Sequence, residues 1–250
     1  MGLWDKHWDM KIIVVIPAYN EAATIRSLAQ DVLGLGLDLI VVDDASRDGT
    51  SDQLAELQLT LIRHQTNRGK AASLRTGIDA ALEAGCDGIV TLDGDGQHRP
   101  ADIPKLISAF SNNLNSLVIG ARLLNREHAP KARRRANDFA DFWISWAAGQ
   151  RIRDSQSGFR LYPAHAAGQV LIDHSRKHGF VYESEFLIEA AHQGLKFQTV
   201  PISSYYPRQA RASHFRPVVD ITRIVLMVAG RLLRSGLNPS GLVEIIWRST

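Results

Sequence analysis

The sequence has little of two features that mark secreted and membrane-spanning proteins, namely paired cysteines and long apolar runs. Its one cysteine, Cys86, excludes an internal disulfide and a cysteine-based zinc cluster. No stretch approaches the roughly 20 uninterrupted apolar residues that span a bilayer. The first ten residues carry Asp5, Lys6, His7 and Asp9, a pattern unlike that of a signal peptide. We therefore expect a cytoplasmic protein.

The sequence also lacks internal repeats, low-complexity tracts and any linker that would divide it. At 250 residues and 27.7 kDa it is long enough for one large α/β domain and short for two.

Charge is unevenly distributed, although the net charge is only +3. Acidic residues are frequent in the N-terminal part, whereas basic residues cluster at 131–135 and between Arg208 and Arg234. This asymmetry predicts anionic partners such as phosphates or acidic lipid headgroups. Nucleic acid is suggested only by the high isoelectric point, without a stacking motif or recognition helix, so we expect no nucleic-acid partner.

Short apolar runs alternate with helical patterns in the first half of the chain. This alternation predicts an α/β fold with a parallel, doubly wound sheet, in which ligands bind beyond the carboxyl ends of the strands. The expected strands are 12–16, 39–42, 60–63, 89–92 and 116–119, and the expected helices are 21–32, 69–84 and 101–110.

The second half is less regular. We expect helices at 131–149, 182–193 and 218–233, a short strand at 158–162 and a last apolar segment at 241–247. The stretch from Ile221 to Trp247 is too apolar for a free tail, so it packs on the domain, dimerises or touches a membrane.

Two carboxylates, Asp93 and Asp95, follow the apolar run 88–92. Side chains alternate along a strand, so the two acids leave its end on the same side. Together with the amide oxygen of Gln97 they suit a hard cation such as Mg²⁺ or Mn²⁺. The glycine between them lets a bulky ligand approach the backbone. The alternative is an acidic turn before the helix that Pro100 starts.

Five segments, taken together, resemble the family-two inverting glycosyltransferases with a GT-A fold, and among these the dolichol-phosphate (polyprenyl-phosphate) mannose and glucose synthases. They are Val15-Ile16-Pro17-Ala18-Tyr19-Asn20-Glu21, Val41-Val42-Asp43-Asp44-Ala45-Ser46-Arg47-Asp48-Gly49-Thr50, Asn67-Arg68-Gly69-Lys70, Leu92-Asp93-Gly94-Asp95-Gly96-Gln97-His98 and Asp154-Ser155-Gln156-Ser157-Gly158-Phe159-Arg160-Leu161-Tyr162. The resemblance implies a Rossmann-like, mostly parallel sheet flanked by helices. It also implies a catalytic domain at 1–215 and a C-terminal segment of amphipathic helices at 216–250.

The resemblance also implies roles for individual residues on the donor side. The nucleotide sugar would be bound by Pro17, Tyr19, Glu21, Asp43, Asp44, Gly69 and Lys70. Plainer alternatives are a carboxylate favoured by the helix dipole for Glu21, turn chemistry for the two aspartates, and a solvated side chain for Lys70. Asp93, Asp95 and Gln97 would hold Mg²⁺ or Mn²⁺ against the diphosphate, and Asp93, Asp95 and Arg122 would be the catalytic residues.

The acceptor side is marked by an absence. Many glycosyltransferases with hydroxyl acceptors carry a Glu-Asp pair after the mid-chain aromatic region, but here the corresponding stretch is 154–159. A phosphate acceptor is already charged and needs positioning rather than a strong base. Candidates for this positioning are Arg122, Arg133, Arg134, Arg135, Arg208, Arg211, Ser213 and His214. The alternatives are a surface side chain for Arg122 and a solvated helix face for 133–135.

One segment departs from the subgroup, which often shows Arg-x-x-Gly-x-Ser-Lys. Here the stretch 208–214 has Arg211 in place of Gly and His214 in place of Lys. We expect a metal-dependent enzyme that moves a hexose from GDP-mannose or UDP-glucose to a lipid phosphate acceptor of the polyprenyl-phosphate type. Two alternatives stay open: another lipid or hydroxyl acceptor with His214 or Asp154 as base, and a non-catalytic nucleotide- or lipid-binding protein on the same fold.

Aromatic and basic residues share the region 131–151, which includes Trp143 and Trp146. With the apolar helix at 218–233, this pattern predicts peripheral association with the inner face of the membrane. The alternative for the tryptophans is ordinary core packing. A homo-oligomer is also compatible with the apolar C-terminal segment.

Overall fold

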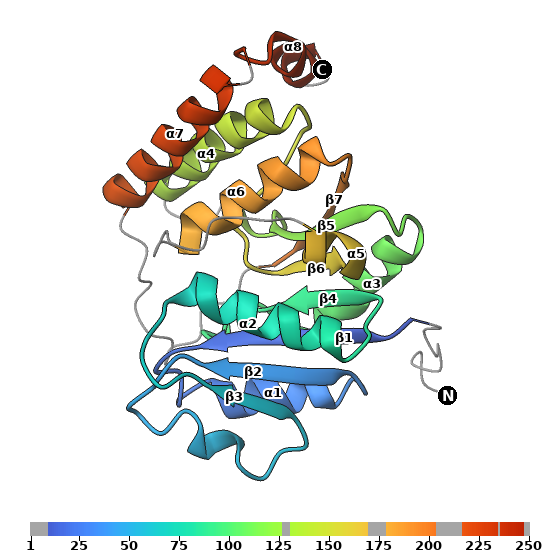
Figure 1. Ribbon diagram of the computed structural model, residues 1–250, viewed down its shortest axis with the longest axis vertical. Helices are drawn as coiled ribbons and strands as arrows, with labels where there is room; N and C mark the ends of the chain where they lie inside the picture. Colours follow the sequence, from blue (N-terminus) through green and yellow to red (C-terminus); the bar gives the residue numbers. More distant parts are fainter. Residues whose placement is uncertain (1–9, 127–130, 170–178, 204–216, 235, 248–250) are drawn as a thin grey trace.

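A seven-stranded sheet forms the centre of the protein in the computed structural model, which describes residues 10–126, 131–169, 179–203, 217–234 and 236–247 (Figure 1). The strand order is β3-β2-β1-β4-β6-β5-β7. The strands are β1 (Ile12–Ala18), β2 (Asp38–Asp43), β3 (Thr60–Arg63), β4 (Gly88–Thr91), β5 (Ser116–Arg122), β6 (Arg160–Pro163) and β7 (Lys196–Ile202).

The sheet is mostly parallel, as predicted, with one exception. The strand β1 pairs in parallel with β2 and β4, β2 with β3, and β5 with β7. The exception is β6, which runs antiparallel to both of its neighbours, β4 and β5. It also begins at Arg160 rather than at Gly158. The predicted doubly wound parallel sheet is therefore correct for β1 to β4 and interrupted at β6.

The helices cover both faces of this sheet. They are α1 (Ile25–Leu33), α2 (Lys70–Glu83), α3 (Ile103–Ser111), α4 (Lys131–Ala148), α5 (Ala164–Gln169), α6 (Gly179–His192), α7 (Pro217–Arg234) and α8 (Pro239–Trp247), with 3₁₀ turns at Asp52–Leu54 and Pro100–Asp102. Alternate residues of β1 pack on opposite faces, with Ile13 and Val15 on the side of α2 and Ile12 and Val14 on the side of α1 and α3.

Three elements differ from the sequence prediction for local reasons. The helix expected from Glu21 starts at Ile25, because the Glu21 carbonyl first closes a turn with the amides of Thr24 and Ile25. The strand β7 was not predicted, since most of its residues are at least partly exposed and it shows no apolar run. The helix α5 has only six residues and gives no periodic signal.

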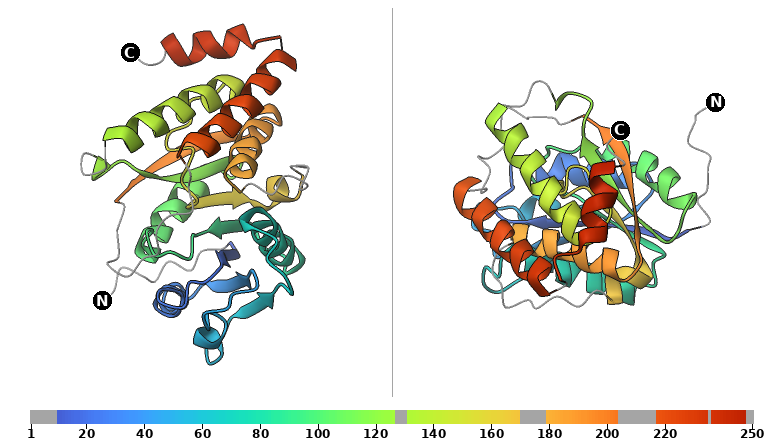
Figure 2. Two further views of the ribbon diagram at one scale, coloured as in Figure 1. Left: turned by 90° about the vertical axis from the view of Figure 1, so that its left-hand side faces the viewer. Right: turned by 90° about the horizontal axis from the view of Figure 1, so that it is seen from above.

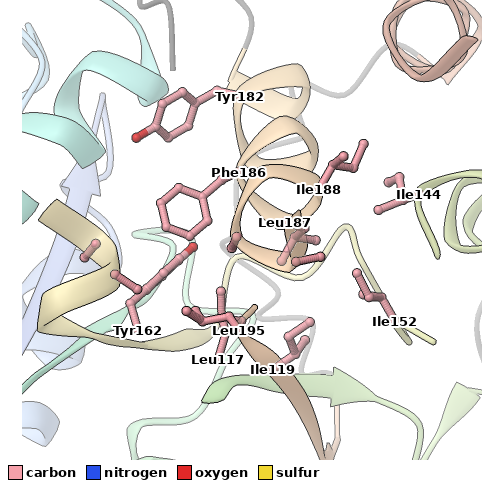
Figure 3. Close-up of a cluster of buried hydrophobic side chains, with 14 of the residues drawn as sticks. Leu117, Ile119, Ile144, Ile152, Tyr162, Tyr182, Phe186, Leu187, Ile188 and Leu195 are labelled. Carbon is pink, nitrogen blue, oxygen red and sulfur yellow. The ribbon is translucent and has the colours of Figure 1, made fainter. Parts of the chain in front are cut away.

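The larger core cluster fixes α6 on the sheet. In Figure 3, Tyr162 of β6 and Phe186 of α6 lie beside Leu117 and Leu195, and the two rings meet edge to face with centroids 5.0 Å apart. Ile144 of α4 lies on the other side of α6. This packing holds the first turns of α6 next to the strand ends, where the candidate site lies.

The C-terminal helices form an outer layer over α4 and α6 (Figure 2). Ile224, Val228 and Leu232 of α7 are buried in the larger core, whereas Leu226 and Leu233 are exposed on its outer face. No helix in the described part of the chain is long and apolar enough to cross a membrane. The domain boundary predicted at residue 215 falls outside the described residues.

The packing of α2 on the sheet predicts a steric test. A methyl group at Gly77 would lie 2.3 Å from Cγ1 of Val15, whereas one at Gly230 on α7 would meet nothing within 4 Å. We expect Gly77→Ala to lower the free energy of unfolding by about 1–3 kcal/mol through overpacking. Gly230→Ala, the matched helical control, should be neutral or stabilising by about 0.5–1 kcal/mol. Urea unfolding measures both, and equal effects would contradict the packing described here.

Candidate active site

Polar loops gather where the parallel strands β1, β2, β4 and β5 end, at one edge of the sheet (Figure 1). This is the edge at which open α/β sheets bind ligands. Pro17 is buried within β1, and Tyr19 and Glu21 follow it with partly exposed side chains.

The loops after β1 and β2 are tied together by side-chain hydrogen bonds. The Asn20 amide donates to Oγ of Ser46 at 2.8 Å, and the Glu21 amide donates to Oγ1 of Thr50 at 2.9 Å. Asn20 has a φ of 56°, a left-handed conformation that asparagine tolerates. These bonds fix the direction in which the chain leaves β1, and with it the position of Glu21.

Asp44 holds the loop that leads into α2. Its Oδ1 lies 2.7 Å from Nδ1 of His64 and accepts a hydrogen bond from the Arg68 amide at 2.8 Å, while its Oδ2 accepts one from the Gly69 amide at 2.7 Å. Gly69 has a φ of 87°, which favours glycine, and Lys70 is the first residue of the helix. The carboxylate therefore sets the start of α2.

Asp43 is fully buried and bonded within its own turn. It accepts hydrogen bonds from the Ser46 amide at 2.8 Å and from the Ser51 hydroxyl, and Nε of Arg63 lies 3.5 Å from its Oδ2. Both aspartates thus make the loop hydrogen bonds that the sequence analysis gives as the alternative to nucleoside binding. Their contact with a nucleoside stays a prediction.

Asp93 and Asp95 follow β4 on a chain that packs tightly against its neighbours. A methyl group at Gly158 would lie 2.6 Å from Oδ2 of Asp93, so glycine is required there for the two segments to approach. At Gly94 a methyl group would lie 3.3 Å from the Pro17 carbonyl. The glycine between the two acids therefore allows the close approach of β1, and the approach of a ligand to it stays a prediction.

Lys70 joins this acidic pair to a carboxylate from α6. Its ammonium lies 2.6 Å from Oδ1 of Asp93 and 2.7 Å from Oε1 of Glu183, and its side chain is only 29% exposed. The alternative of a solvated Lys70 is therefore wrong. The two carboxylates outweigh the effect of burial and raise the pKa of the lysine above its ordinary value, so it stays charged.

The pKa values of Asp93 and Asp95 are shifted in opposite directions. Burial works to raise the pKa of Asp93, but the Lys70 ammonium outweighs it and the pKa lies below its usual value. The pKa of Asp95 is raised, first by burial and then by the charge of Asp93. The negative charge of Asp93 thus makes it harder for Asp95 to lose its proton.

Arg122 at the end of β5 is bound to Asp154. Its Nε lies 2.8 Å from Oδ2 of Asp154 and its Nη2 lies 2.7 Å from Oδ1, so the contact is bidentate. Burial works against the charged form of Asp154, but the arginine outweighs it and lowers the pKa of this carboxyl. The alternative of a solvated surface side chain for Arg122 is therefore wrong.

Asp141 of α4 supports this pair from behind. It accepts hydrogen bonds from the amides of Asp154 and Ser155, each at 2.8 Å, and from the Ser155 hydroxyl at 2.6 Å. Asp154 has a φ of 52°, a strained conformation for aspartate that these bonds hold in place. Burial raises the pKa of Asp141 to about 6.

Arg160 is fully buried and holds Glu183 in position. It donates to the carbonyl oxygens of Ser157 at 2.8 Å, Ser155 at 2.7 Å and Glu183 at 3.1 Å. Its Nη2 also lies 3.6 Å from Oε2 of Glu183. All three guanidinium nitrogens of Arg160 therefore donate hydrogen bonds, which offsets the cost of burying its charge.

His98 lies on the ring of Phe159, with centroids 5.4 Å apart. Burial lowers the pKa of His98 to about 4, so the imidazole is neutral at pH 7. Its buried Nδ1 has no hydrogen-bond partner among the described residues. Nδ1 of His98 can therefore form a hydrogen bond with a ligand or water molecule in the site.

The donor set fits a hard divalent cation. Among the residues that the structure describes, no three His, Cys, Asp or Glu side chains are arranged to hold a metal ion together. A cation beside Asp93 and Asp95 would therefore need further oxygen ligands, such as the Gln97 amide and the phosphates of a substrate. This is the usual pattern for Mg²⁺ and Mn²⁺ bound together with a nucleotide.

Comparisons with known proteins identify the family of the chain. The family model described as "Glycosyl transferase family 2" matches residues 13–173. The chain belongs to this family. It is a glycosyltransferase with a GT-A fold, as the five segments predicted.

Two relatives of this glycosyltransferase cover nearly its whole length. The UDP-N-acetylglucosamine–dolichyl-phosphate N-acetylglucosaminyltransferase of Methanococcus voltae is 30% identical, over 90% of this chain and 99% of the relative. The undecaprenyl-phosphate mannosyltransferase of Micrococcus luteus is 29% identical, over 92% of this chain and 100% of the relative.

A solved structure supports the fold. The glucosyl-3-phosphoglycerate synthase of Mycobacterium tuberculosis, crystallised with Mn²⁺, UDP and glucosyl-3-phosphoglycerate, aligns with a TM-score of 0.66 and 20% identity. The alignment covers 90% of this glycosyltransferase and 80% of that chain.

The other predicted acceptor residues lie at the start of α4 or outside the described part of the chain. Arg134 and Arg135 are on the first turns of α4, partly exposed and exposed. Arg208, Arg211, Ser213 and His214 fall outside the described residues.

Sequence reasoning missed three residues of the glycosyltransferase site: Glu183, Asp141 and Arg160. Each carries a charge where the pattern predicts core. Glu183 is buried in the mostly apolar α6, Asp141 lies among the aromatic residues of α4, and Arg160 falls inside a buried strand. A charged residue at a core position was the signal that could have found them.

The Asp141 carboxyl predicts a pH dependence of stability. Its pKa in the folded protein, about 6, lies above the ordinary 3.8, so the folded state keeps a proton that the unfolded chain loses. Stability therefore falls as the pH rises through this window. Between pH 5 and pH 7 the wild type should lose roughly 1–2 kcal/mol more than Asp141→Asn. Urea unfolding at both pH values measures this, and parallel losses would contradict the assignment.

Proposed function

We propose that this glycosyltransferase moves a hexose from a nucleotide sugar, GDP-mannose or UDP-glucose, to a polyprenyl-phosphate-type lipid with inversion. The two near full-length relatives act, by their names, on dolichyl phosphate and undecaprenyl phosphate, which supports a lipid phosphate acceptor. The observation that carries the proposal is the engagement of Asp154 by Arg122, because it occupies a carboxylate that could otherwise act as the base for a hydroxyl acceptor.

The donor would lie across the ends of β1, β2 and β4. Tyr19 and Glu21, positioned by the bonded loops, would contact the nucleotide together with Pro17, Asp43, Asp44 and Gly69. Asp93, Asp95 and Gln97 would hold Mg²⁺ or Mn²⁺. When bound, this cation neutralises the charge that develops on the leaving diphosphate.

The acceptor phosphate needs positive charge near the sugar carbon. Arg122 brings a guanidinium to the end of β5, where Asp154 holds it through Nε and Nη2. Asp154 has a lowered pKa and an arginine partner, which makes it a poor proton acceptor. Arg134, Arg135, Arg208, Ser213 and His214 remain candidates for further phosphate contacts.

The acceptor proposal is tested with a matched pair of substrates. With Mn²⁺ and a nucleotide sugar, we expect transfer to polyprenyl phosphate and none to the same alcohol without its phosphate. Excess EDTA should stop the reaction. Equal or faster transfer to the alcohol would overturn the phosphate mechanism and favour His214 or Asp154 as base.

A variant of the same assay addresses Arg122. Loss of a charge-assisted phosphate contact costs roughly 1.5–3 kcal/mol, so Arg122→Ala should lower the transfer rate about 10- to 100-fold. Arg75→Ala removes an arginine that pairs with Asp79 inside α2 and is the control. It should transfer at the wild-type rate.

We also propose that the outer helices lie on the membrane surface that carries the acceptor. Phe139 and Phe142 of α4 are 46% and 40% exposed, next to the basic start of that helix. Trp143 and Trp146 pack against the larger core instead, which favours the packing alternative for these two. Homo-oligomerisation stays a prediction.

Membrane binding is tested by flotation with phosphatidylserine vesicles. We expect the protein to float at low salt and less at high salt, because ions screen the basic residues. Phe139→Ser combined with Phe142→Ser should weaken binding, whereas Leu114→Ser, an exposed apolar residue just before β5, should not. A wild type that stays unbound at low salt would leave the exposed apolar residues to a protein partner.

A further inference from the structure

One ammonium group, that of Lys70, is shared by two carboxylates from distant parts of the chain. Asp93 follows β4 and Glu183 lies in the first turns of α6, and both lie within 2.7 Å of the same Nζ. Asp93 is also the carboxylate that the divalent cation would take. The lysine and the metal therefore have a common ligand.

The two carboxylates are fixed, whereas the lysine has a long side chain. Asp93 is confined by the backbone of Gly158, where even a methyl group would lie 2.6 Å from its Oδ2. Glu183 is buried and lies 3.6 Å from the fully buried Arg160. Lys70 starts α2, and four rotatable methylene groups separate its charge from the helix. Of the three groups, the ammonium moves most easily.

Charge makes the two cations exclude each other at Asp93. A divalent ion on this carboxylate repels an ammonium 2.6 Å from one of its oxygens, and the repulsion is strong away from bulk water. An ammonium moved off Asp93 needs an anion that stays beside it, because a charge in a largely buried place is costly without one. Glu183 provides this anion, since its carboxylate lies 2.7 Å from the same Nζ.

We propose that Lys70 is the resident counter-cation of Asp93 and yields this carboxylate to the metal, and that Glu183 is the positioning residue that keeps the displaced lysine in the site. The proposal rests on the proposed function for the presence of metal and nucleotide diphosphate. With the lysine on Asp93, free metal binds weakly. A diphosphate that enters with the metal supplies ligands to the ion and an anion to the lysine, so the two bind together.

The experiment measures Mn²⁺ binding without nucleotide, sugar or acceptor, by electron paramagnetic resonance of the free ion. Lys70→Met should bind Mn²⁺ at least tenfold more tightly than the wild type. Lys70→Arg, which keeps the charge, should stay close to the wild type. Lys196→Met makes the same charge change at the exposed start of β7 and should leave the affinity unchanged. Unchanged or weaker binding by Lys70→Met overturns the proposal.

The role of Glu183 is tested by a variant that should change the Mn²⁺ affinity in the opposite direction. In Glu183→Gln the lysine keeps Asp93 as its partner, so Mn²⁺ should bind more weakly than to the wild type, and the KM for metal in the transfer assay should rise more than kcat falls. Thermal unfolding of each variant establishes that it is folded. If Glu183→Gln unfolds, Glu183→Asp, which shortens the reach to Lys70, replaces it with the same expected sign.

The outcomes separate this proposal from the proposed function. Tighter Mn²⁺ binding by Lys70→Met supports the counter-cation even if the acceptor is not a lipid phosphate. Metal-dependent transfer to polyprenyl phosphate without that tightening overturns the counter-cation alone. Failure of both wild type and Lys70→Met to bind Mn²⁺, with UDP or GDP present, overturns the metal site and the counter-cation together.

Discussion

Burial of charge at the carboxyl edge of the sheet is the constraint on which the rest of the site depends. Asp93, Lys70, Glu183 and Arg160 form a chain of alternating charges that runs from β4 through α2 and α6 to β6. Lys70, Glu183 and Arg160 are buried or partly buried, so the pairing of their charges matters more for stability than that of an exposed ion pair. This series of ion pairs therefore links the positions of α2 and α6 to that of Asp93, one of the acids proposed to bind the metal.

The fold was largely predictable because its strands are short buried runs separated by periodic helices. The strands β1 to β5 and the helices α2, α4 and α7 agree with the prediction to within a few residues. The direction of β6 and the existence of β7 were not predictable, since both depend on pairing with strands far away in sequence. An exposed edge strand such as β7 carries no apolar pattern of its own.

The candidate site was predictable in the same uneven way. Asp93, Asp95 and Lys70 lie in motifs next to strand ends, where local sequence points to them. Glu183 comes from a helix more than a hundred residues later, and long-range packing such as that of Phe186 on Tyr162 brings it to Lys70. The sequence also did not indicate that both carboxylate oxygens of Asp44 accept hydrogen bonds from the loop before α2. A motif residue can thus shape the site through the loop that it holds, while its contact with a nucleoside stays a prediction.

The acceptor side follows the same logic of paired charge. Asp154 holds Arg122 in place through a bidentate contact, and Asp141 fixes the strained backbone of Asp154. A hydroxyl acceptor requires a carboxylate that is free to take a proton, and the tight pairing opposes this. A phosphate acceptor requires a cation held in place and a nucleophile that brings its own charge. The arrangement therefore suits an acceptor that is already an anion, and it does so by positioning rather than by proton transfer.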